Sequence, residues 1–288
     1  MDTVRNGARR DMADFHEMLK KRIVYELPGM EQCNVVKNRV YKTVEEKDLL
    51  LDIYYPADIL DGEQRPAVVC VHGLGPVELV EQIKDSGQYV SWGQAIAASG
   101  LIAVTFNHRS PDEHTSLRDV GSDVDELVVH VRQQAPQLQI DKERLAIWAC
   151  SAGVPLGVRS ALRGTPSFVK CLVAYYGPLN LEPFQVHWHL TEDEVREFSA
   201  TTYLEKAASK LAPMLITKAG LDFPDLNATI DHFIKEASAK NVTLDFMTHP
   251  GGQHAFDVLD DVARSREIIQ RTLAFLKISL ISSSSLRV

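Results

Sequence analysis

A serine at position 151 stands where the sequence best supports nucleophilic chemistry. Residues Leu145–Ala149 are mostly apolar and predict a short buried strand, and residues Val154–Arg163 predict a helix. Ser151 therefore lies at the apex of a strand-turn-helix segment. A serine hydroxyl is a weak nucleophile unless it is held rigidly beside a base. A sharp turn would hold it so, and such a turn needs small residues on both sides, which Ala149 and Gly153 provide.

A second small-residue segment, His72–Gly75, follows another predicted buried strand. Its glycines let the backbone approach a ligand without interference from side chains. We expect the N–H groups of Leu74 and Ala152 to hold a developing oxyanion. His72 is then a structural neighbour rather than the base, and with Gly73 it would border the substrate pocket. The segment lacks the third glycine that a nucleotide-binding loop requires.

A candidate acid, Asp222, follows the strand predicted over Pro213–Lys218. A carboxylate at the end of a strand could accept an imidazole N–H and fix the tautomer of that ring. Asp225 competes with it but is better placed to begin the next helix. Asp245 lies within a predicted strand and is less suited.

Two histidines, His249 and His254, lie in a glycine-rich loop after the last predicted strand. A histidine in such a loop can reach back over the edge of the sheet. His254 directly precedes the final predicted helix and is the preferred base, and His249 is the alternative.

The elements around these residues alternate between strand and helix from Ala67 onward. This alternation predicts a parallel sheet with right-handed crossovers and helices on both faces. It also places the four segments at the carboxyl ends of strands, where ligands bind in such sheets. Two earlier strands predict an antiparallel start, Asn34–Lys42 and Leu49–Tyr55. The remaining predicted elements are helices over Arg9–Arg22, Gln88–Ser99, Val120–Gln133, Asp225–Lys240 and Asp257–Ile278, and strands over Ala67–Val71, Leu101–Phe106, Val169–Tyr175 and Thr243–Thr248.

These segments resemble the α/β-hydrolase family, and within it the dienelactone-hydrolase-like and related small serine esterases. The motifs that carry the resemblance are His72-Gly73, the Ser151 turn, Ala219-Gly220-Leu221-Asp222 and Gly252-Gln253-His254-Ala255-Phe256, and the similarity covers roughly Leu49 to Leu276. It implies an α/β-hydrolase fold with a mostly parallel central sheet of about eight strands. It also implies cofactor-free hydrolysis at an acyl carbon, and the order Ser151, Asp222, His254 is the serine, acid, histidine order of the family.

Two departures from the family pattern stand out. Ala149 replaces the first glycine of the G-x-S-x-G turn, which adds one methyl group to a crowded position. The dienelactone hydrolases themselves use a cysteine nucleophile, whereas this chain has Ser151, preceded by Cys150 at the end of the strand. Dienelactone is therefore a doubtful substrate.

The stretch 180–211 interrupts the alternation, and at about 30 residues it is long for a strand-to-helix connection. Thr191 and Glu194 have the spacing of a capping box, which predicts a short helix. Phe184 and Trp188 predict an apolar wall beside the acyl group of a substrate. We expect a short lid here, and a surface excursion without a role is the alternative. The predicted organisation is a helical extension over 1–30, an α/β-hydrolase domain over 31–280 that contains the 180–211 insertion, and a tail over 281–288.

Composition excludes several classes of function. The 288 residues carry a net charge of −8 without a basic run, which argues against a nucleic-acid partner. The sequence has no apolar stretch of about 18 residues that would span a membrane. The polar N-terminus lacks the apolar region of a signal peptide, and four cysteines without CxxC spacing predict neither disulfides nor zinc, so we expect a cytoplasmic protein. His187 and His189 have no third ligand nearby, and we expect no metal and no cofactor.

The sequence therefore predicts a serine hydrolase that acts on small-molecule esters through Ser151, Asp222 and His254. A thioesterase, an acyltransferase or a small peptidase would use the same three residues, because the choice of leaving group depends on the shape of the pocket. A non-catalytic small-molecule-binding relative and a homo-oligomer also stay open.

Overall fold

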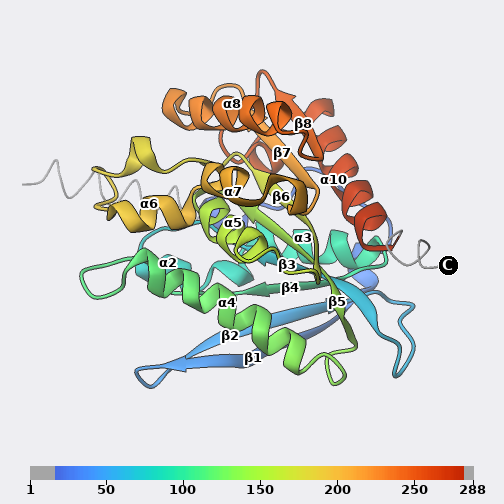
Figure 1. Cartoon of the computed structure of the whole chain (residues 1–288). Coiled ribbons are helices and arrows are strands. Elements are labelled where there is room, and N and C mark those ends of the chain that lie inside the picture. The colour runs from blue at the N-terminus through green and yellow to red at the C-terminus, as the bar shows by residue number, and fades with distance from the viewer. Residues whose placement is uncertain (1–16, 282–288) are drawn as a thin grey trace, which may run out of the picture.

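An eight-stranded sheet forms the centre of the protein in the computed structural model, which describes residues 17–281 (Figure 1). Its strand order is β1-β2-β4-β3-β5-β6-β7-β8. β1 pairs with β2 and β2 with β4 in antiparallel fashion, and every later pair is parallel. The strands are β1 (Asn34–Val44), β2 (Lys47–Tyr55), β3 (Arg65–Val71), β4 (Ile102–Phe106), β5 (Ile140–Cys150), β6 (Val169–Tyr175), β7 (Met214–Ala219) and β8 (Leu244–His249). The predicted mostly parallel sheet is confirmed.

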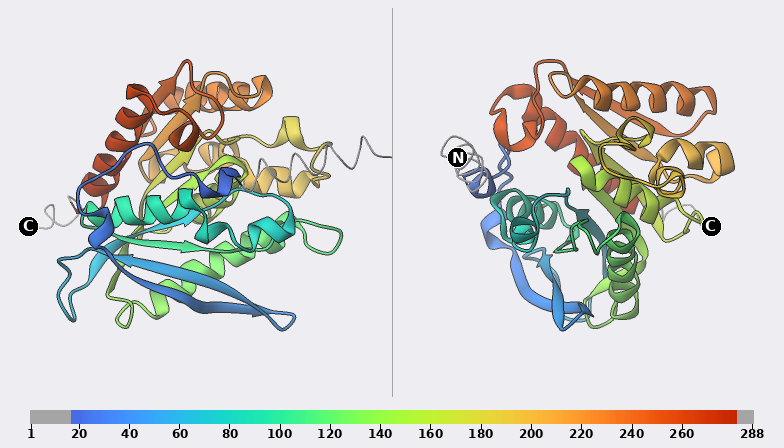
Figure 2. Two further views of the ribbon diagram at one scale, coloured as in Figure 1. Left: turned by 180° about the vertical axis from the view of Figure 1, so that it is seen from behind. Right: turned by 90° about the vertical axis from the view of Figure 1, so that its left-hand side faces the viewer.

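Helices cover both faces of the sheet (Figure 2). They are α2 (Val77–Val80), α3 (Gly87–Ala98), α4 (Leu117–Gln133), α5 (Val154–Leu162), α6 (Glu192–Phe198), α7 (Ala200–Ala207), α8 (Pro224–Ala239), α9 (Phe256–Leu259) and α10 (Ala263–Ile281). One core lies between the sheet and α4, α5, α7 and α8, and the other lies between the sheet and α3, α9 and α10. None of the helices within 17–281 is long and apolar enough to cross a membrane.

The middle strands are buried on both sides, as their continuous apolar runs predict. In β3, Val69 and Val71 face the α4 core, whereas Val68 and Cys70 face the α3 core. The register brings the strand ends together, because Val71 pairs with Ala149 and Cys150 pairs with Tyr175. The residues that follow β3, β5 and β6 consequently leave the sheet side by side.

The prediction of one final helix over Asp257–Ile278 is wrong. The segment divides into α9 and α10, with Asp260 in a non-helical conformation between them. The Asp260 carboxylate accepts hydrogen bonds from the backbone N–H and the side-chain amide of Gln253, at 2.9 and 2.6 Å. The break therefore ties the histidine loop to the start of α10, which an apolar pattern cannot reveal. Of the helix predicted over Arg9–Arg22, residues 17–20 are helical, and its first part lies outside the described residues.

The methyl group of Ala149 finds its space on the facing helix. A Cβ atom added to Gly157 in α5 would lie 2.7 Å from the Ala149 Cβ atom, closer than two carbon atoms can approach. The extra methyl that departs from the G-x-S-x-G pattern is thus accommodated by a glycine eight residues later.

We expect Gly157→Ala to lower the free energy of unfolding, because overpacking costs about 1–3 kcal/mol and outweighs the gain in helix propensity. Adding Ala149→Gly to Gly157→Ala should recover most of that loss. Denaturant unfolding of the two single variants and the double variant measures both effects. Equal losses in the Gly157→Ala variant and the double variant would contradict the proposed contact.

Candidate active site

Three side chains from different loops meet at the carboxyl edge of the sheet. The Ser151 Oγ atom lies 2.8 Å from His254 Nε2, and His254 Nδ1 lies 2.7 Å from Asp222 Oδ2. A carboxylate oxygen accepts, so Nδ1 carries the proton, and Nε2 is left to accept from the serine hydroxyl. The other Asp222 oxygen accepts the backbone N–H of Phe223 at 2.8 Å. The side chain of Asp222 is fully buried, whereas that of His254 is one-third exposed (33%).

The competing candidates lie elsewhere. His249 is buried and bonds through Nε2 to Ser265 Oγ at 3.0 Å. Asp225 lies in the first turn of α8, and Asp245 lies within β8. Among the described residues, neither carboxylate forms a hydrogen bond or an ion pair with a histidine.

Ser151 has the left-handed backbone conformation that presents its hydroxyl at the apex of the turn. Its φ is 54°, a region that L-amino acids rarely occupy. Two glycines allow the surrounding chain to close on it. A Cβ atom at Gly153 would lie 2.2 Å from the carbonyl oxygen of His72, and one at Gly177 would lie 2.3 Å from that of Ser151. The strained turn is therefore held between the segments that follow β3 and β6.

The backbone beside the serine leaves an open space, which we call the cradle. A Cβ atom at Gly73 would lie 3.6 Å from both Ser151 Oγ and the backbone nitrogen of Ala152, so the missing side chain leaves that space open. The backbone N–H groups of Leu74 and Ala152 have no acceptor among residues 17–281. Two free N–H groups beside a serine hydroxyl are what an oxyanion would require.

His72 orients the peptide that carries the Leu74 N–H group. Its Nε2 atom accepts the backbone N–H of His108 at 3.3 Å, so Nδ1 carries the proton and donates to the Gly73 carbonyl at 2.7 Å. In a trans peptide the Leu74 N–H points away from that carbonyl. Burial, and then the charge of the stacked His108 ring, lower the pKa of His72 well below its usual value. A neutral His72 keeps the donor in place.

A cavity of about 910 Å³ opens beside this cradle, lined by Leu74, Gly75 and Ala152. One wall runs from Ser110 in the β4–α4 loop to Leu117 at the start of α4, and the other is the segment from Trp188 to Glu194. Of the residues predicted to form the pocket, Trp188 lines the cavity, whereas Phe184 packs on the Trp188 ring with 5.2 Å between centroids. His72 is buried behind the cradle and does not line the cavity.

The β4–α4 loop was not predicted to line the site. Its position after a buried parallel strand could have indicated this role, since β4 ends at Phe106 on the same edge of the sheet as the strands that precede the other site segments. The predicted capping box of the insertion is confirmed. Thr191 Oγ1 accepts the Glu194 N–H at 3.2 Å, and the Glu194 carboxylate accepts the Thr191 N–H.

Tyr176 also belongs to the site, although it was not predicted from the sequence. Its ring lies edge-on to the His254 imidazole, with 4.9 Å between centroids. Its hydroxyl donates to Asp257 at 2.6 Å, and the same buried carboxylate accepts from Trp92 and Gln88 at 2.8 and 3.0 Å. Burial raises the pKa of Asp257 above its usual value, although the three donors oppose this effect. The ring of Tyr176 is thereby fixed against the imidazole.

Cys150, next to the serine, is buried and faces away from the cavity. Its sulfur lies 2.9 Å from the Tyr89 hydroxyl in the α3 core. Burial raises the pKa of this thiol to about 12, so it stays protonated at neutral pH. The available nucleophile at this turn is the serine.

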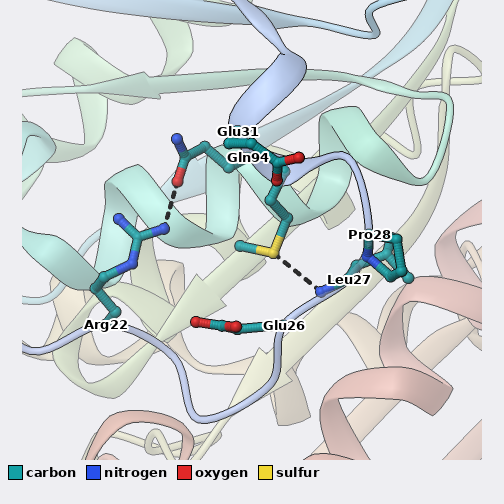
Figure 3. A pocket seen from close by; sticks show the side chains of 7 residues that line it. Arg22, Glu26, Leu27, Pro28, Glu31 and Gln94 are labelled. Atoms are coloured by element: carbon teal, nitrogen blue, oxygen red, sulfur yellow. Dashed lines mark hydrogen bonds between the residues drawn. The ribbon is translucent and has the colours of Figure 1, made fainter.

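Another hollow, of about 390 Å³, lies between the N-terminal segment and α3 (Figure 3). Arg22, Glu26 and Glu31 give it mixed charge, and Arg22 bonds to Gln94. Ser151, Asp222 and His254 do not line this hollow. Within residues 17–281 no group of three His, Cys, Asp or Glu side chains could hold a metal ion, and the pair His187 and His189 gains no third partner there.

Comparisons with known proteins agree with this architecture. The BD-FAE family model matches residues 51–220, more than half of the chain, and the chain belongs to this family. The solved structure of native esterase 2 from the planctomycete Thermogutta terrifontis superposes with a TM-score of 0.68 at 20% identity, covering 87% of this chain and 93% of that one. Its propionate-bound form gives 0.68 at 22% identity, covering 91% and 98%. Its form phosphonylated by cyclosarin gives 0.67 at 22% identity, covering 91% and 97%.

At these identities the similarity shows the fold, which is the α/β-hydrolase fold. A comparison with curated proteins found no match.

We expect Tyr176→Phe to slow the labelling of Ser151 by a fluorophosphonate about tenfold, because a base held out of line accepts the serine proton less effectively. Tyr175→Phe is the matched control, since Tyr175 is the buried last residue of β6, directly before Tyr176, and its hydroxyl bonds to Thr272 of α10 at 2.6 Å. Labelling rates and thermal unfolding of both variants separate positioning from stability. Equal labelling by the two variants, whatever their stability, would contradict the positioning role.

Proposed function

We propose that the protein is a serine hydrolase that cleaves carboxylic esters of small to medium acyl groups through an acyl-enzyme intermediate. The observation that carries the proposal is the continuous hydrogen-bonded line from Ser151 through His254 to Asp222, with the free N–H groups of Leu74 and Ala152 beside it. Each of these groups has a role in acyl transfer, and no other reaction class uses all of them together.

In the first half of the reaction, Ser151 Oγ attacks the ester carbonyl carbon while His254 Nε2 takes the hydroxyl proton. The carbonyl oxygen becomes an anion and accepts hydrogen bonds from Leu74 and Ala152. Asp222 holds the imidazole in the required tautomer and stabilises its cation. His254 then gives the proton to the leaving oxygen, the carbon–oxygen bond breaks, and an alcohol departs from the acyl-enzyme.

In the second half, His254 takes a proton from water, and the resulting hydroxide attacks the acyl carbon. The tetrahedral intermediate collapses when the bond to Ser151 Oγ breaks and the proton returns to that oxygen. The products are a carboxylic acid and the free enzyme, and no cofactor enters the balance.

The structural relatives support an ester rather than another acyl donor. The Thermogutta terrifontis protein is called an esterase, and its structures are described as bound to propionate or butyrate and as phosphonylated by cyclosarin. The serine nucleophile and the buried Cys150 fit the serine-esterase side of the dienelactone-hydrolase-like resemblance. Thioester, amide and transfer activities share the same mechanism up to the acyl-enzyme and are outcomes of substrate tests.

We expect Ser151→Ala and His254→Ala each to lower kcat for a butyrate ester by about 10⁴- to 10⁶-fold, because removing either partner leaves the nucleophile inactive. His249→Ala is the control, since His249 bonds to Ser265 and not to the triad. Steady-state kinetics and fluorophosphonate labelling measure the effect. A Ser151→Ala variant that keeps more than about a tenth of the wild-type rate would refute the mechanism, and an unlabelled wild-type protein would favour a non-catalytic binding function.

The lid segment gives a prediction about acyl length. Trp188 walls the cavity next to the cradle, and burying the acyl chain is worth about 0.8 kcal/mol per CH₂ group. Trp188→Ala should therefore change the ranking of acetyl, butyryl and octanoyl esters in kcat/KM, with little change in stability. If the three values fall by one common factor or do not change, Trp188 is not the acyl wall.

A further inference from the structure

A further hollow borders the catalytic histidine, His254. It has a volume of about 500 Å³, and His254 and Gln253 form one wall of it. Leu221, Phe223 and Pro224 form the other wall, which we call the Leu221–Phe223 shelf. Leu221 and Phe223 are each 69% exposed, which is unusual for two large apolar side chains on either side of a buried carboxylate.

The turn after β7 forces these two side chains outward. The Leu221 N–H bonds to the Gly252 carbonyl at 2.9 Å, and the Asp222 N–H bonds to Ala219 at 3.2 Å. A Cβ atom at Gly220 would lie 2.2 Å from the carbonyl oxygen of Pro250, so the turn is packed tightly against the histidine loop. With Asp222 pointing inward, its neighbours must face solvent. The turn explains their direction, and it does not explain why both are large and apolar.

The reaction geometry assigns the two hollows to different halves of an ester. The leaving oxygen must receive its proton from His254 Nε2, so the alcohol half lies on the histidine side. The oxyanion lies at Leu74 and Ala152, and these residues line only the 910 Å³ cavity. The two hollows share no lining residue. If the acyl half occupies the cavity beside Leu74 and Ala152, the hollow that borders His254 is the space left for the alcohol half.

We propose that the Leu221–Phe223 shelf is the alcohol subsite and that it selects esters of neutral, hydrophobic alcohols, a proposal that rests on the ester hydrolysis proposed above. Half-buried Met18 and Leu259 complete the apolar lining, and no lysine or arginine lines the hollow. Its one acidic group, Asp222, is occupied by His254 and the Phe223 N–H. A charged alcohol would lose solvation there without gaining a partner.

Two butyrate esters with similar intrinsic reactivity test the proposal, ethyl butyrate and 2-phenylethyl butyrate. The wild-type enzyme should show the higher kcat/KM for the phenylethyl ester, and Phe223→Ser and Leu221→Ser should each lower the ratio of the two values about tenfold. Leu60→Ser is the matched control, because Leu60 is 72% exposed and lines neither hollow. Both esters form the same butyryl-enzyme, so the ratio reports only the steps in which the alcohol is still bound.

Four outcomes would overturn the subsite. These are an unchanged ratio in both shelf variants, an equal fall of the ratio in Leu60→Ser, a change in acyl-length ranking caused by Phe223→Ser, and a wild-type dimer that Phe223→Ser converts to monomer. The last result would make the shelf a contact between two copies of the chain. Failure of the ester-hydrolase proposal itself is recognised separately, because the wild-type protein would then hydrolyse neither ester, or Ser151→Ala would retain hydrolysis of both.

Discussion

The left-handed conformation of Ser151 is the constraint on which the rest of the site depends. A residue with a positive φ persists only where its surroundings impose it. Here the His72 carbonyl closes over Gly153, and Gly177 closes over the Ser151 carbonyl. Three parallel strands must therefore end at the same level for the turn to form. The register of the sheet, through the pairs Val71–Ala149 and Cys150–Tyr175, achieves this, so the site is a consequence of strand alignment.

One feature of the sequence allowed both the sheet and the residues Ser151, Asp222 and His254 to be predicted. Buried parallel strands appear as continuous apolar runs, and Ser151, Asp222 and His254 lie in the segments that follow the strands β5, β7 and β8. Loop residues between those positions were harder to assign. The β4–α4 loop carries no distinctive motif, so its role as a cavity wall depends on the tertiary path of the chain.

Contacts between distant segments account for the remaining differences. The break between α9 and α10 depends on Asp260 binding the backbone of Gln253, and the apolar periodicity of the segment is unaffected by it. Tyr176 was visible only as the residue after a strand, and its partner Asp257 was assigned to a helix. The hydrogen bond between Tyr176 and Asp257, and the contact of Tyr176 with His254, form only when the folded chain brings these distant segments together. Local sequence patterns predict helices and strands, but they do not reveal which side chains pair across loops.

Cys150 gives the site a chemical property of its own. Thiolates are the forms that peroxides oxidise, and they are accessible only when a thiol is exposed and has a low pKa. Here the thiol is buried in the α3 core with its pKa raised to about 12, and the hydroxyl beside it is inert to mild oxidants. An oxidant that enters the cavity meets no reactive sulfur at the nucleophile turn. The choice of serine over cysteine thus makes the nucleophile turn insensitive to the redox state of its surroundings.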